Sequence, residues 1–127
     1  LITHDLGVVA ESAQRVVVMY GGQVVEEAPV RTLFAEPAHP YTRGLMQAMP
    51  RVGMNRERLT TIPGSVPPPT AWPSGCRFRD RCSHAWNRCE VDAPAMIAVS
   101  AGHQARCHLA EGDRAPEPTR VRAARPL

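Results

Sequence analysis

The sequence predicts a mixed α/β fold that is followed by an irregular, cysteine-rich segment. Three observations lead to this prediction. Over residues 1–28 the spacing of apolar side chains changes from strand type to helix type and back, a pattern typical of α/β proteins. Residues 29–50 continue with two short helical stretches. All four cysteines come later, between Cys76 and Cys107.

The first elements are expected to be a strand and a helix. Residues 1–3 are apolar and include β-branched side chains, which favours the end of a buried strand. Asp5 is a good N-cap, because its carboxylate accepts the unpaired amide hydrogens of a helix start. Apolar residues then recur at helical spacing and give the helix one apolar face: Leu6, Val9, Ala10 and Ala13.

A tight β-hairpin is predicted next. Residues 16–20 are mostly valine and form one strand, and residues 23–27 return as its partner. Gly21 and Gly22 lie between them and supply the positive φ angles that a two-residue hairpin turn requires.

Two short amphipathic helices are expected to cover the sheet. Pro29 favours a helix start at Val30, and Pro37 ends that helix. A second helix opens at His39-Pro40 and stacks Tyr41, Leu45 and Met49 along one face. His39 is interpreted as a helix-start residue rather than a metal ligand.

The chain divides into three regions. Residues 1–50 form the α/β part, and residues 51–108 form an extension that begins with a proline-rich connector and holds the four cysteines. The prolines favour extended backbone, so the connector is expected to lie as a fixed strap over the surface. Residues 109–127 lack apolar periodicity and are predicted to be a disordered tail.

Composition excludes several classes of function. The 15 basic residues are all arginine, but they are scattered among acids and only 5% of residues are aromatic, which argues against nucleic-acid binding. No run approaches the roughly 20 apolar residues that span a bilayer, so direct membrane insertion is not expected. The first residue is a leucine inside an apolar run, and we expect a truncated or fragmentary chain.

His4 is the candidate catalytic residue. It follows an apolar run and precedes a helix start, and ligands of open α/β sheets bind where strands end. A neutral imidazole there can hydrogen-bond a phosphate oxygen and help to hold an attacking water. The residues alone leave open the alternative that His4 caps the helix or lies at an unremarkable surface site.

The four cysteines, Cys76, Cys82, Cys89 and Cys107, are the candidate metal or cofactor ligands. Their segment has few apolar residues, and such segments usually need a covalent or metal staple. Two disulfides, a zinc ion and a 4Fe–4S cluster are the possible staples, and unligated thiols are the remaining alternative. Zinc could recruit His84, His103 or His108 as further ligands, but the C-x-x-C spacing that zinc prefers is absent. The neighbouring arginines, Arg77, Arg79, Arg81 and Arg88, could offset thiolate charge.

Several segments resemble one known family. Residues 1–11 resemble the switch-histidine segment of ABC transporter ATPases, in which the histidine contacts the γ-phosphate of ATP between two subunits. Three further segments are similar to the C-terminal part of oligopeptide and dipeptide importer ATPases, a group that includes nickel importers. They are His39-Pro40-Tyr41-Thr42-Arg43-Gly44-Leu45, Ile62-Pro63-Gly64-Ser65-Val66-Pro67, and residues 75–82 around the first two cysteines.

This resemblance implies the C-terminal part of an ABC ATP-binding subunit that couples ATP hydrolysis to peptide uptake. It implies ATP with Mg²⁺ as the cofactor of the intact subunit, and a second ATPase subunit and membrane permease subunits as partners. The expected location is the cytoplasmic face of the plasma membrane, as a peripheral protein. Some members of the group carry a 4Fe–4S cluster, so the resemblance favours the cluster over zinc.

The sequence lacks three parts of an ATPase site. It contains no G-x-x-x-x-G-K-S/T phosphate loop, no acidic strand end for Mg²⁺ and no Leu-Ser-Gly-Gly-Gln signature. Phosphoryl transfer needs these parts together, so the chain alone is expected neither to bind ATP tightly nor to hydrolyse it. The alternative hypotheses are a stand-alone iron–sulfur or zinc module and a decayed, non-functional fragment.

Overall fold

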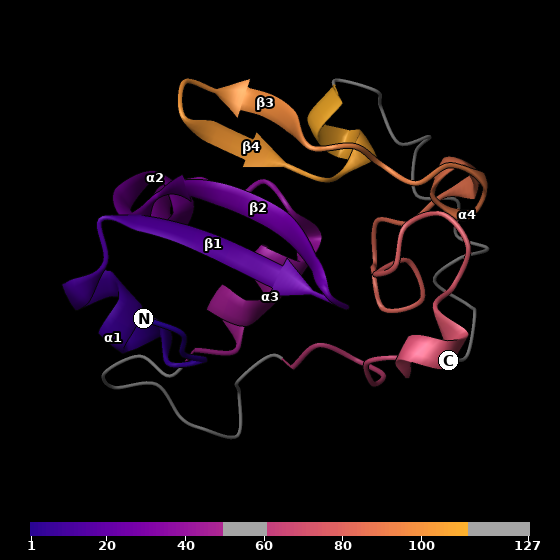
Figure 1. The fold of residues 1–127 in the computed structure, drawn as a ribbon, viewed down its shortest axis with the longest axis horizontal. Coiled ribbons are helices and arrows are strands. Elements are labelled where there is room, and N and C mark those ends of the chain that lie inside the picture. The colour runs from indigo at the N-terminus through magenta and orange to yellow at the C-terminus, as the bar shows by residue number, and fades with distance from the viewer. Residues whose placement is uncertain (50–60, 112–127) are drawn as a thin grey trace.

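The structure is a computed structural model in which residues 1–49 and 61–111 are described (Figure 1). The predictions for residues 50–60 and 112–127 lie outside this part of the chain. The elements in chain order are α1 (Leu6–Ser12), β1 (Arg15–Tyr20), β2 (Gln23–Pro29), α2 (Val30–Ala35), α3 (Pro40–Gln47), η2 (Pro69–Ala71), α4 (Asn87–Val91), β3 (Ile97–Ser100), β4 (His103–Ala105) and η3 (His108–Glu111).

The strands form one four-stranded antiparallel sheet in the order β1-β2-β4-β3. Gly21 and Gly22 have φ angles of 58° and 79° at the turn between β1 and β2, so the predicted hairpin is confirmed. β4 joins the opposite edge of β2, where Glu26 pairs with Ala105. Figure 1 shows β2 between β1 and the β3–β4 hairpin, with the cysteine-rich loop near the turn of the first hairpin.

The core draws on both predicted regions. Alternate residues of β1 point inward, ending with Tyr20, and Leu33 of α2 and Met46 of α3 pack against them. Phe78, from the cysteine-rich segment, is buried in the same cluster, 5.0 Å from the Tyr20 ring and 5.3 Å from the Tyr41 ring. The cysteine-rich segment therefore shares a sheet and a core with the N-terminal region.

Both predicted helix starts are confirmed. Pro29 is the N-cap of α2, and His39 is the N-cap of α3, where its Nδ1 accepts a hydrogen bond from the Tyr41 amide at 3.0 Å. Asp5 caps α1 as expected, accepting from the amides of Gly7 at 2.9 Å and Val8 at 3.2 Å.

The strand predicted at residues 1–3 is wrong for this structure. These residues have no strand conformation, and the side chains of Leu1 and Ile2 are 89% and 103% exposed. A strand needs a neighbour for its backbone hydrogen bonds, and no strand of the described residues pairs with this segment.

The cysteine-rich segment is less irregular than predicted. It contains α4 and the β3–β4 hairpin, because β-branched Ile97 and Val99 precede a turn in which Gly102 has a φ of 72°. The predicted disordered tail also begins too early, since residues 109–111 belong to η3. There Ala110 donates to the Cys107 carbonyl at 3.0 Å, and Glu111 lies 2.7 Å from the Arg88 guanidinium.

Candidate functional site

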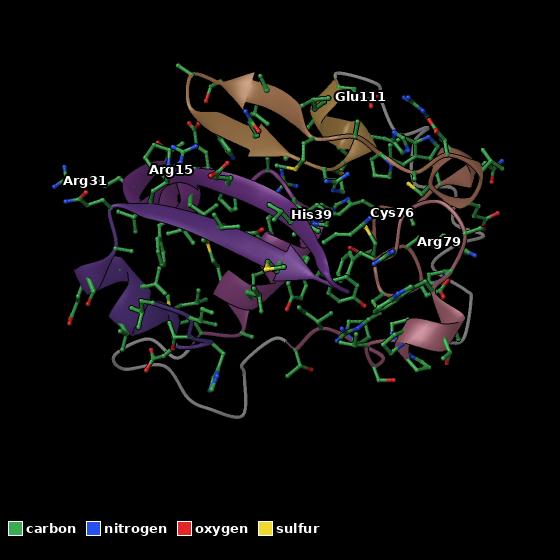
Figure 2. The ribbon with its side chains drawn as sticks, viewed as in Figure 1. Arg15, Arg31, His39, Cys76, Arg79 and Glu111 are labelled. Atoms are coloured by element: carbon green, nitrogen blue, oxygen red, sulfur yellow. The ribbon has the colours of Figure 1, made fainter. Side chains whose placement is uncertain are left out.

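All four cysteines line one cavity, although they come from different parts of the fold. Cys76 and Cys82 lie on a series of turns, Cys89 is in α4, and Cys107 lies between β4 and η3. The space between the lining residues is about 320 Å³, including the part open to solvent at the mouth. Figure 2 shows Cys76 on the loop beside the sheet, with His39 between them.

A close backbone contact brings Cys76 and Cys89 together. The Cys76 amide donates to the Cys89 carbonyl at 2.8 Å, and the Ser74 hydroxyl donates to the Glu90 carbonyl at 2.8 Å. Gly75 makes this approach possible, because it has a φ of 69° and a Cβ at this position would lie 2.2 Å from the Cys89 carbonyl oxygen. No other residue type fits there without moving the backbone.

The cysteines are free thiols, and burial controls their acidity. Burial raises the pKa of Cys82 to about 12 and that of Cys107 to about 11, and it also raises the pKa of Cys76. These three groups are therefore protonated at neutral pH in the metal-free chain. A metal or cluster would displace their protons on binding.

Backbone amides face the same sulfur atoms. The His84 amide donates to Cys82 Sγ at 3.4 Å. Amides of Phe78 and Arg79 act on Cys76, and amides of the two residues in the turn after Cys107 act on Cys107, in each case lowering the thiol pKa against the larger effect of burial. Hydrogen bonds to sulfur stabilise the thiolate form that metals require.

The described part of the chain holds no preformed site for a single metal ion. Within residues 1–49 and 61–111, no three Cys, His, Asp or Glu side chains are close enough to ligate one metal ion. Zinc needs its ligands about 2.0–2.3 Å from a single point. In a 4Fe–4S cluster each thiolate binds a different iron, so four thiols around one cavity can lie farther apart.

The three histidines considered as extra zinc ligands differ in position. His84 and His108 line the cavity. The His108 ring is buried, and its Nε2 donates to the Asp92 carbonyl at 2.8 Å. His103 does not line the cavity, because its Nε2 lies 2.5 Å from the buried carboxylate of Glu26. The prediction of His103 as a possible ligand is therefore wrong in this geometry.

Two of the arginines in this segment donate hydrogen bonds to backbone carbonyls. Of the four arginines expected to offset thiolate charge, Arg79 lines the cavity and helps to lower the pKa of Cys76. Arg77 donates to the Gly21 carbonyl at 2.5 Å and lies over the Trp72 ring, and Arg81 donates to the Pro63 carbonyl at 2.9 Å. The Arg77–Gly21 bond holds the cysteine-rich segment against the turn of the first hairpin, and the Arg81–Pro63 bond ties it to the preceding connector.

His4 lies on the exposed segment before α1, next to the N-cap Asp5, and does not line the cysteine cavity. Its imidazole is available to a partner from outside the described residues. The structure thus separates the two candidate sites that the sequence predicted, the phosphate-contacting histidine and the cysteine cluster.

Sequence reasoning missed a buried polar centre in the sheet. Glu26, on β2, is fully buried and accepts hydrogen bonds from the amides of Ala38 at 2.7 Å and His39 at 2.9 Å, as well as facing His103. The turn at Gly102 was the available signal, because recognising the β3–β4 hairpin places His103 on a strand.

None of the helices in the described part of the chain has the length and apolar character needed to cross a membrane.

Comparison with known proteins places these features in a family. The family model described as "Oligopeptide/dipeptide transporter, C-terminal region" matches residues 25–89, slightly more than half of the chain. The chain is 49% identical over 117 residues to the oligopeptide transport ATP-binding protein AppD of Bacillus subtilis, covering 92% of this chain and 36% of that protein. It is 44% identical over 108 residues to the dipeptide transport ATP-binding protein DppD of Escherichia coli, covering 85% of this chain and 33% of that protein.

The chain thus spans about a third of the length of these relatives. The matched region runs from β2 through α4 and includes three of the four cysteines. On this evidence, the chain belongs to the family of oligopeptide/dipeptide transporter C-terminal regions.

Proposed function

We propose that the chain is the C-terminal portion of the ATP-binding subunit of an ABC importer that couples ATP hydrolysis to oligopeptide or dipeptide uptake. The observation that carries the proposal is the alignment of 92% of the chain with an oligopeptide transport ATP-binding protein. In this proposal residues 1–50 close the ATPase domain, and residues 51–108 are the extension specific to the peptide-importer group.

The exposed apolar surface supports a larger ATPase domain. Leu1 and Ile2 are exposed, and Val17 and Met19 project from the outer face of β1 with 49% and 57% of their surface accessible. Among the described residues β1 pairs with β2 alone, so its other edge offers unpaired backbone groups. The rest of a P-loop ATPase domain would cover the exposed apolar side chains and would supply hydrogen-bond partners to the open edge of β1.

In the intact subunit, His4 is the residue that contacts the γ-phosphate of ATP. Its exposed position just before a helix start leaves the imidazole free to face a nucleotide held with Mg²⁺ by the missing phosphate loop. The partners are a second ATP-binding subunit, which closes the nucleotide site, and the membrane permease subunits. The complex would place this chain at the cytoplasmic face of the plasma membrane, as a peripheral subunit.

The test uses the complete importer in lipid vesicles. His4→Ala should lower ATP hydrolysis and coupled peptide uptake by about 10²–10³-fold while ATP binding persists, because one preorganised donor to the phosphate is removed. Glu11→Ala, on the exposed face of α1, is the matched control and should leave both rates unchanged. Equal rates for the His4→Ala variant and the wild type would contradict the assigned role.

The isolated chain provides a second test. It lacks the phosphate loop and signature, so isothermal titration calorimetry should detect no ATP binding at micromolar concentrations. Stoichiometric binding of ATP by the isolated chain would overturn this part of the proposal.

We further propose that the four cysteines hold a 4Fe–4S cluster, with zinc as the second candidate. The support is their shared cavity and the amides that face their sulfur atoms. When bound, the cluster supplies a cross-link between four distant positions of the chain. These cysteines would then act as a clasp that holds the turns, α4 and the end of β4 together.

Single substitutions test the ligand set. Each of Cys76→Ser, Cys82→Ser, Cys89→Ser and Cys107→Ser should lower the iron bound by anaerobically reconstituted protein, and Ser83→Ala should not, since Ser83 is exposed and outside the cavity. Unchanged iron in any one cysteine variant removes that residue from the ligand set. Tight zinc binding without iron or sulfide would favour the second candidate.

A stand-alone metal module is the alternative function. It is favoured by one observation, that the cavity receives all four cysteines from the described residues alone. The size of the native polypeptide, measured with an antibody against residues 61–111, separates the two functions. A species about three times the length of this chain, like its relatives, supports the importer subunit, and a species of this length supports the module.

A further inference from the structure

The C-terminal end of α4, the helix that carries Cys89, receives hydrogen bonds from two other parts of the chain. The last carbonyls of a helix have no partner inside the helix and need donors from elsewhere. The carbonyls of Cys89 and Glu90 accept from the turn that carries Cys76. The carbonyl of Asp92, the C-cap of α4, accepts at 2.8 Å from Nε2 of His108. The end of α4 therefore joins two turns that each carry a further cysteine.

Cys107 lies between two residues that both donate to the segment after α4. Arg106 directly precedes Cys107, and its guanidinium donates to the Pro94 carbonyl at 3.3 Å. His108 directly follows Cys107 and donates to the Asp92 carbonyl. Both Pro94 and His108 also line the cavity. The backbone on each side of Cys107 is thus attached to the segment that leaves α4.

The His108 ring is enclosed, and its two nitrogens differ. The ring is 1% exposed and packs edge-on against the Trp86 ring at 6.0 Å. A carbonyl can only accept, so Nε2 carries the proton that is donated to Asp92. Nδ1 is buried without a hydrogen-bond partner among the described residues, since Oε1 of Glu111 is 3.6 Å away. A phenylalanine would fill this space without an unpaired nitrogen, so the Nε2 donor is what distinguishes histidine here.

An ion pair also joins η3 to α4. Glu111 lies 2.7 Å from the Arg88 guanidinium, and 25% and 33% of the two side chains are accessible. Ion pairs that are open to solvent contribute little to stability. Breaking the His108 bond is more costly, because its donor is buried and would be left unpaired. We therefore expect His108, rather than the ion pair, to fix the start of η3.

We propose that His108 is a positioning residue of the cysteine site, whose Nε2 attaches the Cys107 turn to the end of α4 and so keeps Cys107 on the cavity wall. The proposal deepens the proposed cysteine site and, for its meaning, rests on it. Because Cys107 is buried, a reagent reaches its thiol only when this turn opens. Loss of the His108 bond should make such openings more frequent.

Three substitutions separate the hydrogen bond from the ring and from the ion pair. His108→Phe keeps a ring against Trp86 and loses the donor. His108→Gln loses the ring, but its amide nitrogen can donate from near the Nε2 position. Glu111→Gln weakens the ion pair with Arg88 and leaves the His108 bond in place, so it is the matched control.

Two rates are measured in the full chain. Mass spectrometry follows the alkylation of Cys107 and Cys82 in the metal-free form, and a chelator assay follows iron loss from the loaded form. Cys82 is the internal reference, because it lies on a different turn and a general loss of stability would speed the alkylation of both thiols.

The expected result is specific to one variant and one thiol. His108→Phe should speed Cys107 alkylation and iron loss about three- to tenfold, the range for one net hydrogen bond, and leave Cys82 alkylation within about twofold of wild type. His108→Gln and Glu111→Gln should stay within about twofold in all rates. Unchanged rates in His108→Phe, equal acceleration of both thiols, or equal acceleration in either glutamine variant would overturn the proposal.

A measurement on the unaltered chain covers the case in which a variant does not fold. Long-range ¹H–¹⁵N spectra of histidine-labelled protein at neutral pH should show a proton on Nε2 of His108 that exchanges slowly with water. An Nε2 without a proton would contradict the proposal. If the wild type binds neither iron nor zinc, the proposed cluster fails, while Cys107 alkylation and the Nε2 proton still decide the role of His108.

Discussion

Gly75→Ala is the substitution that should damage the cysteine site most selectively. At this position a Cβ would lie 2.2 Å from the Cys89 carbonyl oxygen and 2.9 Å from the Glu90 carbonyl carbon. Both neighbours are backbone atoms, so a side-chain rotation cannot relieve the clash. The turn that carries Cys76 must therefore move away from α4.

Two costs add up in this variant. A φ of 69° costs an L-residue about 1–2 kcal/mol. Withdrawing the turn also loses the hydrogen bond from the Cys76 amide to the Cys89 carbonyl, which is 2.8 Å long and worth about 1 kcal/mol net. The free energy of unfolding should fall by about 2–3 kcal/mol.

Gly102→Ala is the matched control. Gly102 has a similar φ of 72°, but the nearest atom to its Cβ would be the flexible Arg15 guanidinium at 3.6 Å. The free energy of unfolding of this variant should fall only by the cost of the positive φ angle, about 1–2 kcal/mol. The difference between the two variants isolates the contact between Cys76 and Cys89.

Urea denaturation of the metal-free chain measures the stability, and iron analysis after anaerobic reconstitution measures the site. We expect Gly75→Ala to be less stable than Gly102→Ala and to retain less iron. If the two variants are equally stable and bind equal iron, the close approach of Cys76 to Cys89 is not a feature of the folded chain.

The remaining predictions concern buried polar groups. Glu26→Gln should lower the free energy of unfolding by about 3 kcal/mol, because it breaks a buried interaction with His103. Glu27→Gln, whose carboxylate forms an exposed pair, should lower it by less than about 1 kcal/mol in the same urea titration, and equal losses would contradict the structure. Burial holds the pKa of His39 at about 4 against its usual 6.5, so the unfolded chain takes up this proton first as the pH falls. The metal-free chain should thus lose about 3 kcal/mol between pH 6.5 and pH 4 through this ring, a component that should be missing from denaturation curves of His39→Gln. Burial raises the pKa of Cys82 to about 12, so near pH 8 its alkylation, followed by mass spectrometry, should be about 10²–10³-fold slower than that of free cysteine; matching rates would show an unburied thiol.

The N-terminal half of the fold could be predicted because its signals are local. Two adjacent glycines define the first hairpin turn, and Asp5, Pro29 and His39 mark the three helix starts within one turn of each helix. Each signal acts through a backbone bond or a φ angle that a single residue controls. The interpretation of His39 as a helix-start residue was correct for the same reason.

The remaining elements of the fold depend on contacts between distant parts of the chain. β4 is three residues long, and its place in the sheet depends on β2, which lies more than seventy residues earlier in the chain. The role of Glu26 follows from that pairing, because only the docked β4 brings His103 to its carboxylate. The strand predicted at residues 1–3 is wrong for a related reason. Its local sequence favours a strand, but no partner strand is present in the described part of the chain.

The candidate site could be predicted in composition but not in geometry. The sequence identified four cysteines as one constellation, and the structure places all four around one cavity. It could not indicate that Arg77 and Arg81 bind backbone carbonyls instead of facing the thiols. Nor could it indicate that the His39 ring joins the cavity wall, because that depends on where β4 docks.

The most direct test of this account is the metal content of the protein purified without oxygen. Iron and acid-labile sulfide analysis, with visible and electron paramagnetic resonance spectra, should give about four irons and four sulfides per chain and the signals of a 4Fe–4S cluster. Substituting any of the four cavity cysteines should abolish these signals. A colourless, iron-free preparation would contradict the cluster at the centre of the proposed site.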